Sequence, residues 1–386
     1  MNRFLLYDVN PGEGFNLRRD VYLRMANLVK MLNKVQLWTL VLPAWNHLYH
    51  WRSDVNQTNI PWYTFFDIGS LNKHVPVIEF HDFVKVMDGR PIDDVIYFQH
   101  YKEGWGGKWV EKMDDRECND NHPFYQLEDG LWHWYMPNIT SVRFKCVSIQ
   151  AEYSFLKDYL IHNLSNSWAV MFPRGEQVMH GEYSEWTARR SVRFSKDLVS
   201  IGDKFRSTML DSDDFRDQTV MEDNWKKMKR KHGDALGGPY LAAHLRRRDF
   251  LYGHQDKLPS MKAAAQRINE ILDDLHLKKV FVATDASGEE LEGLKINIKP
   301  SVEVYRYQGD KNVLRKYGDG GVAIIDQWIC AHARYFIGTT SSTFSFRIHE
   351  EREILGFRQE TTYNAFCVDG NSACEQPSKW KIIYKK

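Results

Sequence analysis

The chain has 386 residues, and a single hydrophobic core rarely grows to that size, so we expect about two domains. Its 52 Lys and Arg residues are balanced by 51 Asp and Glu residues, and a formal charge of +1 gives no general attraction to nucleic acid or to an anionic membrane. No stretch is long and apolar enough to span a bilayer, and residues 1–20 lack the apolar core of a signal peptide. We therefore expect a soluble protein with neither nucleic acid nor a membrane as partner.

The N-terminal segment alternates between strand and helix patterns. Phe4–Val9 is a short apolar run that predicts a strand, and Asn10–Gly14 has the Pro and Gly residues of a turn. Asn16 can cap the helix that follows, and Trp38–Leu42 predicts the next strand. The helix is indicated by apolar residues at helical spacing, namely Leu17, Val21, Met25, Leu28, Val29 and Leu32.

The turn after the first strand carries one carboxylate. In Gly12-Glu13-Gly14 the two glycines let the backbone approach a ligand closely, and Glu13 projects from the turn. A carboxylate whose pKa is raised by partial burial can act as a general base toward a hydroxyl. An exposed turn glutamate with no catalytic role is the alternative, and the motif by itself is more typical of that.

The middle of the chain, from about residue 84 to 218, is rich in Trp, Tyr and charge and shows no clear alternation. We expect it to hold insertions on the first domain. The domain junction is placed near His232-Gly233, ahead of the next clear strand, which gives domains of residues 1–232 and 233–386. The sequence contains no apparent internal repeat or low-complexity tract.

The next strand is the most informative part of the chain, because the apolar run at 240–245 leads through His244 and Leu245 into Arg246–Arg248. Such a run predicts a strand covered on both faces, and ligands of parallel sheets bind at the carboxyl ends of the strands. One guanidinium group can donate two parallel hydrogen bonds to phosphate oxygens, which favours a phosphate or diphosphate ligand. A basic surface loop that pairs with nearby carboxylates is the alternative.

Strand and helix patterns alternate again in the C-terminal part. Lys279–Asp285 predicts a strand, a helix follows from Ser287, Gly321–Ala333 has helical spacing, and Tyr335–Thr339 predicts another strand. Strands that alternate with helices indicate a parallel sheet, so both halves of the chain are expected to be Rossmann-like α/β domains.

The last predicted strand enters a hydroxyl-rich turn, Thr339–Ser345, which opens a helix. Amides and hydroxyls at a helix N-terminus bind anions, although a plain Ser or Thr cap explains the sequence nearly as well. We favour the anion site over the plain cap, because we expect this turn to lie close to Arg246. We expect the Gly12–Asn16 turn and the Arg246 loop to form opposite walls of one cleft.

The five cysteines are unevenly spaced. Cys118 lies near Cys146 and Cys367 near Cys374, while Cys330 stands alone in an apolar helical pattern. Two local disulfides and one buried thiol are the simplest interpretation.

Three N-glycosylation sequons accompany the cysteines, at Asn56, Asn138 and Asn163. Together with the predicted disulfides they favour the lumen of the secretory pathway. If so, we expect that a signal peptide has been removed from this sequence.

Two further patterns suggest metal ligands. Asp211-Ser212-Asp213 matches the Asp-x-Asp pattern of metal-binding sugar-nucleotide enzymes, but it sits in a polar run and a solvated loop is the preferred interpretation. His47 and His50 have helical ligand spacing without an obvious third ligand, and we interpret them as packing or groove surface.

Long blocks of the chain, in the right order, resemble the protein O-fucosyltransferases over nearly the whole length, and in particular the branch that acts on thrombospondin type 1 repeats. The blocks that carry the resemblance are Tyr7–Asp20, His244–Arg247, Asp319–Trp328 and Ser342–Arg347.

The resemblance implies a GT-B fold, GDP-β-L-fucose as donor, no obligatory metal or cofactor, and a place in the endoplasmic reticulum lumen. Glu13 would be the catalytic base, on the N-terminal domain with the acceptor groove, and Arg246 would bind the diphosphate on the C-terminal domain. The implied donor site consists of Gly12, Glu13, Gly14, Phe15, Asn16, His244, Leu245, Arg246, Asp326, Thr343 and Phe344.

The reaction implied is inverting transfer of fucose to a Ser or Thr hydroxyl of a folded, disulfide-bonded repeat, by an enzyme that we expect to be a monomer. Two alternatives stay open. The first is the sister activity on epidermal-growth-factor-like repeats, and the second is a non-catalytic protein that binds cysteine-rich repeats for quality control.

Overall fold

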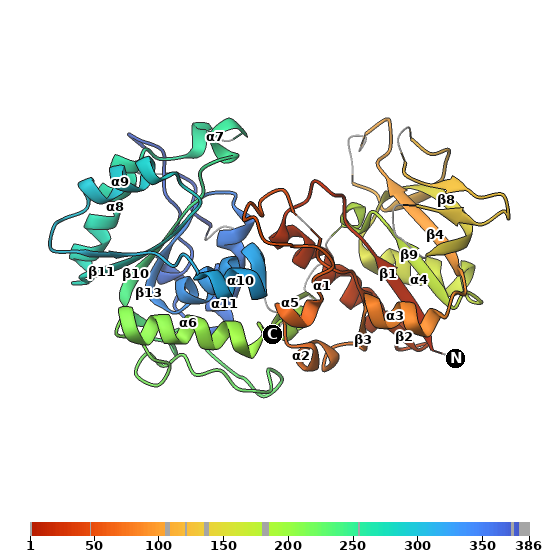
Figure 1. Cartoon of the computed structure of the whole chain (residues 1–386), viewed down its shortest axis with the longest axis horizontal. Helices are drawn as coiled ribbons and strands as arrows, with labels where there is room; N and C mark the ends of the chain where they lie inside the picture. Colours follow the sequence, from red (N-terminus) through yellow and green to blue (C-terminus); the bar gives the residue numbers. More distant parts are fainter. Residues whose placement is uncertain are drawn as a thin grey trace. The chain divides into compact units, whose positions relative to one another are not determined.

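The computed structural model describes residues 2–46, 48–104, 109–119, 122–134, 139–179, 185–253, 255–371 and 374–377. The chain divides into two compact units, of which unit 1 is Met1–Arg193 and unit 2 begins at Phe194. Each unit is an α/β fold with parallel strands (Figure 1). The predicted fold class of two Rossmann-like domains is therefore confirmed.

Unit 1 is built on a parallel sheet in the order β3-β2-β1-β9-β4-β8. Three short antiparallel strands, β5, β6 and β7, extend it as insertions in the middle of the chain, as expected. The strands are β1 Arg3–Tyr7, β2 Trp38–Leu42, β3 Val77–Glu79, β4 Ile92–Gln99, β5 Lys112–Asp115, β6 Tyr125–Gln126, β7 Trp132–His133, β8 Thr140–Gln150 and β9 Ala169–Phe172.

Helices cover both faces of this sheet. Phe4 of β1 packs on Phe83 of α3 with ring centroids 5.1 Å apart, whereas the next residue along the strand, Leu5, faces the other side because side chains alternate. The helix α1 packs against α4 and α5. The helices are α1 Phe15–Leu32, α2 Ile68–Asn72, α3 Phe80–Met87, α4 Tyr153–Asn163 and α5 Glu185–Ser191, with 3₁₀ turns at Trp62–Thr64 and Gly175–Gln177.

The helix α1 begins earlier than predicted, since Gly14 is its N-cap and Asn16 lies inside its first turn. The Asn16 side chain accepts a hydrogen bond from Arg19 at 3.3 Å. A Cβ atom on Gly14 would lie 2.6 Å from His50 Nε2, so the imidazole would have to move if another residue occupied the cap.

Unit 2 contains a four-stranded parallel sheet in the order β12-β11-β10-β13. Helices α8 and α9 lie together on one face (Figure 1), and α10 packs on the sheet as well. The elements are α6 Lys196–Met209, β10 Gly238–Leu245, α7 Phe250–Gly253, α8 Met261–Asp274, β11 Lys279–Thr284, α9 Gly288–Asn297, β12 Glu303–Tyr305, α10 Lys311–Ala331, β13 Ala333–Ile337 and α11 Thr343–Leu355, with 3₁₀ turns at Gln255–Lys257 and Gln359–Thr361.

Both predicted disulfides are present, Cys118–Cys146 and Cys367–Cys374, and Cys330 is a buried thiol. Asn56 and Asn163 are exposed, while Asn138 lies outside the described residues. Within the described ranges, no helix is long and apolar enough to cross a membrane.

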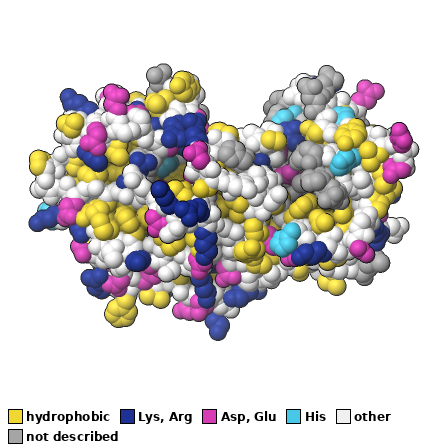
Figure 2. Space-filling view, in the orientation of Figure 1, with side chains coloured by type: hydrophobic (Ala, Val, Ile, Leu, Met, Phe, Trp, Pro, Cys, Tyr) yellow, Lys and Arg dark blue, Asp and Glu magenta, His cyan; other side chains and the backbone are white. Residues whose placement is uncertain are grey.

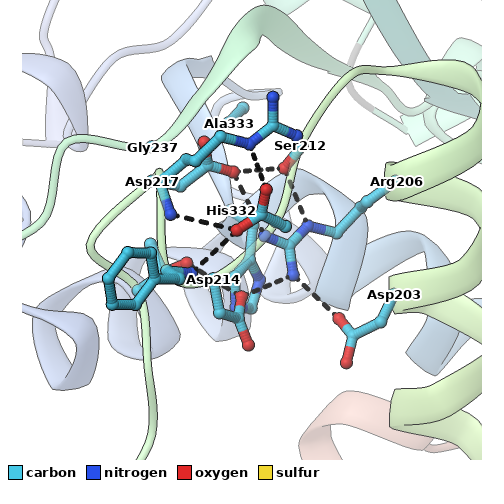
Figure 3. A network of polar contacts seen from close by, with 12 residues as sticks. Asp203, Arg206, Ser212, Asp214, Asp217, Gly237, His332 and Ala333 are labelled. Atoms are coloured by element: carbon cyan, nitrogen blue, oxygen red, sulfur yellow. Dashed lines mark hydrogen bonds and ion pairs between the residues drawn. The ribbon is translucent and has the colours of Figure 1, made fainter.

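The junction between the units lies at residues 193–194, well before the predicted position at 232–233. The reason is α6, which packs on α10, together with a loop at 210–219 that is ordered around the buried Arg206 (Figure 3). The guanidinium of Arg206 lies 2.8 Å from both Asp203 Oδ1 and Asp214 Oδ1 and 3.4 Å from Asp217 Oδ2. These contacts attach the whole segment to unit 2.

The interpretation of Asp211-Ser212-Asp213 as a solvated loop holds for its two aspartates but not for Ser212. Ser212 is buried, and its hydroxyl donates to Asp217 and accepts from Arg206 Nε at 3.2 Å. The two aspartates do face solvent, but each is paired with a cation, Asp211 with Lys279 and Asp213 with Arg216. No cluster of three potential metal ligands occurs among the described residues.

The buried cation yields a stability prediction. Replacing Arg206 with Met leaves three carboxylates without their shared partner, and removing one member of a buried ion pair costs about 3–5 kcal/mol. We expect the urea midpoint for loss of unit 2 structure, followed by tryptophan fluorescence and circular dichroism, to fall clearly. Arg216→Met is the matched control, because the ion pair of this exposed arginine with Asp213 lies at the surface, where such pairs contribute little. Equal midpoints for the two variants would contradict the network's role.

Candidate functional site

In unit 1, the candidate site is the loop that follows β1, residues 8–14, at the carboxyl end of the sheet. The strand β9 pairs with β1 in parallel, with Tyr7 opposite Phe172, so the segments that follow both strands meet. Gly175 donates its backbone N–H to the carbonyl of Asp8 at 2.9 Å. In this way Glu13 is brought to a segment about 160 residues away in the sequence.

Glu13 is partly buried in this loop. Burial raises the pKa of its carboxyl group, and the negative charge of Glu176 adds to that rise, while Arg18 and Arg174 act in the opposite direction. The backbone is also fixed, because the Glu13 N–H donates to the Asn10 carbonyl at 2.9 Å. A raised pKa makes a carboxylate a stronger base toward a hydroxyl.

The residues next to Glu13 differ in what they can offer a ligand. Gly12 is exposed, and Gly14 and Asn16 are partly exposed. Phe15 is buried in an aromatic cluster, where its ring lies 4.8 Å from Trp45 and 5.5 Å from Phe65 between ring centroids. Phe15 therefore anchors the start of α1, and only its backbone can face a ligand.

In unit 2, the candidate site lies where β10 ends between its two neighbours. The Thr339 hydroxyl, just after β13, donates to the His244 carbonyl and accepts the backbone N–H of Arg246, both at 2.9 Å. His244 is buried, its Nδ1 lies 2.8 Å from Ser345 Oγ, and its ring stacks on Phe344 with centroids 4.3 Å apart. The end of β10 is thus tied to the start of α11.

His244 does not add positive charge to this site. Burial, with smaller contributions from Arg246 and His349, lowers the pKa of His244 to about 3. The imidazole is therefore neutral at physiological pH, and the cationic character that the sequence suggested belongs to the arginines.

The three arginines have different partners. Arg246 is mostly buried and forms ion pairs with Asp249 at 2.7 Å and with Asp285 at 2.6 Å. Arg247 pairs with Glu290 at 2.8 Å and donates to the Pro259 carbonyl, so it fixes the loop. Arg248 has a positive φ of 27° and donates to the Asp285 backbone carbonyl. Asp249, the residue that follows the three arginines in the sequence, is thus a partner of Arg246.

Asp326 and Thr343 complete the predicted set in unit 2. Asp326 lies on α10, where burial raises the pKa of its carboxyl to about 8 against the opposing effect of Arg306. Its Oδ1 is buried without a hydrogen-bond partner among the described residues. Thr343 is exposed at the first position of α11.

Charges of both signs occur on the visible face of each unit (Figure 2). This distribution agrees with the formal charge of +1 and with a cationic site that is local. The histidine pair is only partly described, since His47 lies outside the described residues. The imidazole of His50 packs against Gly14, beside the candidate loop of unit 1.

Sequence reasoning missed Arg174, Glu176 and Asp285 as neighbours of the predicted residues. Arg174 and Glu176 follow β9 in the stretch that showed no clear alternation, although Ala169–Phe172 is a short apolar run of the kind that predicts a buried strand. Asp285 ends a predicted strand, but its partner could be found only once the strand order was known.

The family described as GDP-fucose protein O-fucosyltransferase matches residues 4–355 of the chain. The human GDP-fucose protein O-fucosyltransferase 2 is 50% identical over 394 residues, which cover 99% of this chain and 90% of the human protein. The protein of the same name from Caenorhabditis elegans is 48% identical, with the same coverage of 99% and 90%.

Solved structures agree on the fold. POFUT1 in complex with GDP-fucose has a TM-score of 0.61 and 17% identity, covering 96% of this chain and 98% of that one. POFUT1 in complex with GDP has a TM-score of 0.59 and 17% identity, covering 96% and 99%. With a family match over most of its length and a 50% identical relative, the chain belongs to the GDP-fucose protein O-fucosyltransferase family.

Proposed function

We propose that the protein transfers fucose from GDP-β-L-fucose to a Ser or Thr hydroxyl of a folded thrombospondin type 1 repeat, with inversion at the anomeric carbon. One observation carries the mechanism: Glu13 is partly buried at the carboxyl end of β1, with its pKa raised by burial and by Glu176. Such a group accepts a proton from a hydroxyl more readily than an ordinary surface carboxylate does.

The proposed transfer step needs no cofactor, because the bonds that form and break and the proton that moves are all accounted for by the two substrates and Glu13. The acceptor oxygen forms a bond to the fucose anomeric carbon, its proton passes to Glu13, and the bond from that carbon to the GDP oxygen breaks. GDP leaves with the bonding electrons, and Arg246 stabilises the charge that develops on the diphosphate. Thr343 and the amides at the start of α11 assist, since a helix N-terminus favours anions.

The rest of the donor is assigned to unit 2. His244 and Phe344 form a stacked pair beside Arg246 and give the site an uncharged wall. Asp326 presents a buried oxygen that would accept a hydrogen bond, and a guanine edge offers N–H donors. Gly12, Gly14 and Asn16 of unit 1 are assigned to the donor site through the family motif.

We place the enzyme in the endoplasmic reticulum lumen as a monomer that needs no metal. Two disulfides and exposed sequons at Asn56 and Asn163 support an oxidising compartment. The paired aspartates of 211–213 support metal independence, because each already has a cationic partner.

The acceptor class is tested by one incubation with labelled GDP-fucose and three substrates: a folded thrombospondin type 1 repeat, the same repeat after reduction and alkylation, and a folded epidermal-growth-factor-like repeat. We expect label in the first alone. Label in the third alone would assign the sister activity, and label in none would favour a non-catalytic binding protein.

The role of Glu13 is tested by Glu13→Gln, which keeps the side-chain size and removes the base. We expect kcat to fall by about 10²–10⁴-fold, the usual contribution of general base catalysis, while GDP affinity measured by calorimetry stays unchanged. Glu128→Gln is the control, because Glu128 is an exposed turn glutamate of the same unit. Wild-type turnover in Glu13→Gln would show that another group takes the proton.

The role of Arg246 is tested by Arg246→Lys, which keeps the charge but loses the two-pronged geometry. We expect kcat/KM for GDP-fucose to fall on the order of 10²-fold, with weaker GDP binding. Arg267→Lys, at an exposed arginine on α8, should behave as the wild type. If both variants have equal kinetics, the arginine loop has only a structural role.

Metal independence is tested by dialysis against EDTA followed by the transfer assay. We expect the rate to be retained. A complete loss that only an added divalent cation restores would contradict the proposed leaving-group stabilisation by Arg246.

A further inference from the structure

The loop that carries Glu13 is held from one side by a single arginine. The guanidinium of Arg18 donates from Nε to the Glu13 carbonyl at 3.1 Å and from Nη2 to the carbonyls of Asn10 at 3.1 Å and Val9 at 3.3 Å. Its Nη1 forms an ion pair with Asp8 at 3.3 Å. One side chain therefore contacts both ends of the loop.

Helix formation does not explain why an arginine occupies this position. Arg18 lies in the first turns of α1, where the partial positive charge of the helix N-terminus disfavours a cation, and the first turn contains no acidic residue to offset it. The contacts with the loop offset this unfavourable interaction with the helix N-terminus, because they give the guanidinium a carboxylate and three carbonyl acceptors.

A carboxylate holds the same loop from the β9 side. Glu176 accepts the backbone N–H of Asn10 through Oε2 at 3.2 Å, and its Oε1 is paired with Arg174. Arg174 in turn donates to the Tyr97 hydroxyl at 3.0 Å. Asn10 is thus bound by Arg18 at its carbonyl and by Glu176 at its N–H.

In the described part of unit 1, the charged groups that act on the Glu13 carboxyl come from α1 and from the segment after β9. Arg18 comes from α1, and Arg174 and Glu176 come from the segment after β9. Asp8, at the end of β1, is paired with Arg18, and the titratable imidazole of His50 packs on the neighbouring Gly14.

We propose that Arg18 and Glu176 are positioning residues for Glu13, which hold its loop from opposite sides with opposite charges. This inference rests on the proposed role of Glu13 as the base. Arg18 fixes the backbone from which the Glu13 side chain extends, and Glu176 fixes the middle of the loop at Asn10. Together they position the backbone that carries the carboxyl group.

The two residues act on the Glu13 carboxyl in opposite directions. Glu176 raises the pKa of Glu13, second only to burial, whereas Arg18 lowers it. Removing the charge of Glu176 therefore lowers the pKa, and removing that of Arg18 raises it. A base must be deprotonated to act, so activity falls as the pH drops through its pKa. The acid limb of kcat/KM then moves to lower pH in Glu176→Gln and to higher pH in Arg18→Gln.

The experiment measures the pH profile of kcat/KM in the full-length enzyme with three variants, Arg18→Gln, Arg18→Lys and Glu176→Gln. We expect opposite shifts of the acid limb of kcat/KM in the two Gln variants. Arg18→Gln should also lose at least tenfold in kcat on the pH plateau, because its loop is no longer held. Arg18→Lys should restore the position of the acid limb of kcat/KM, since it keeps the positive charge. It should not restore kcat on the pH plateau, since lysine lacks the two-pronged geometry of the guanidinium.

The matched controls are Arg116→Gln and Glu103→Gln, which break an exposed ion pair elsewhere in unit 1. Neither should move the profile. Circular dichroism checks that each variant is folded. If Arg18→Gln does not fold, Arg18→Lys and the near-isosteric Glu176→Gln still test the proposal.

A second readout separates this inference from the proposed function. Titration of carboxyl-¹³C-labelled glutamate by NMR, assigned with Glu13→Gln, follows Glu13 without an activity assay. If its titration shifts as expected while Glu13→Gln still transfers fucose, the positioning inference stands and the role of Glu13 as base is wrong. If Glu13→Gln is inactive, but neither the Glu13 titration nor the acid limb of kcat/KM shifts more in the Arg18 and Glu176 variants than in the controls, the inference is overturned.

Discussion

The parallel pairing of β1 with β9, and of β10 with β11 and β13, brings distant charged residues together at the carboxyl ends of the strands. In unit 1 this pairing sets Glu176 against the loop of Glu13, and in unit 2 it sets Asp285 against Arg246. Charges held in this way are oriented before any ligand arrives, which is the condition under which they stabilise a reaction at small reorganisation cost. The proposed chemistry of both units depends on the strand order.

The neighbours of Glu13 also bear on the stereochemistry. A second carboxylate nearby raises the question of a retaining mechanism, in which one carboxylate attacks the sugar. Glu176 is poorly suited to that role, because Oε1 is paired with Arg174 and Oε2 accepts the Asn10 N–H. Glu13 is thus the one carboxylate of this pair available to the acceptor hydroxyl, and a single base is what an inverting displacement requires.

The sequence predicted the regular elements well where patterns were local. Trp38–Leu42 is a strand with the predicted bounds, and Ser287 caps α9 through a capping box with Glu290. The start of α1 was missed, because Gly14 caps the helix without a side-chain hydrogen bond, whereas a capping side chain was expected from the sequence. Partners such as Glu176 were missed for a related reason: contacts across parallel strands leave no trace in the spacing of either segment.

The central claim is that one carboxylate base drives a single displacement at the anomeric carbon. It is tested most directly by the configuration of the product, read from the one-bond ¹³C–¹H coupling at the anomeric carbon of fucose on the modified repeat. Inversion of GDP-β-L-fucose predicts an α-linked fucose. A β-linked product would contradict the single-base mechanism and would require either a covalent intermediate on the enzyme or attack from the same face as the leaving GDP.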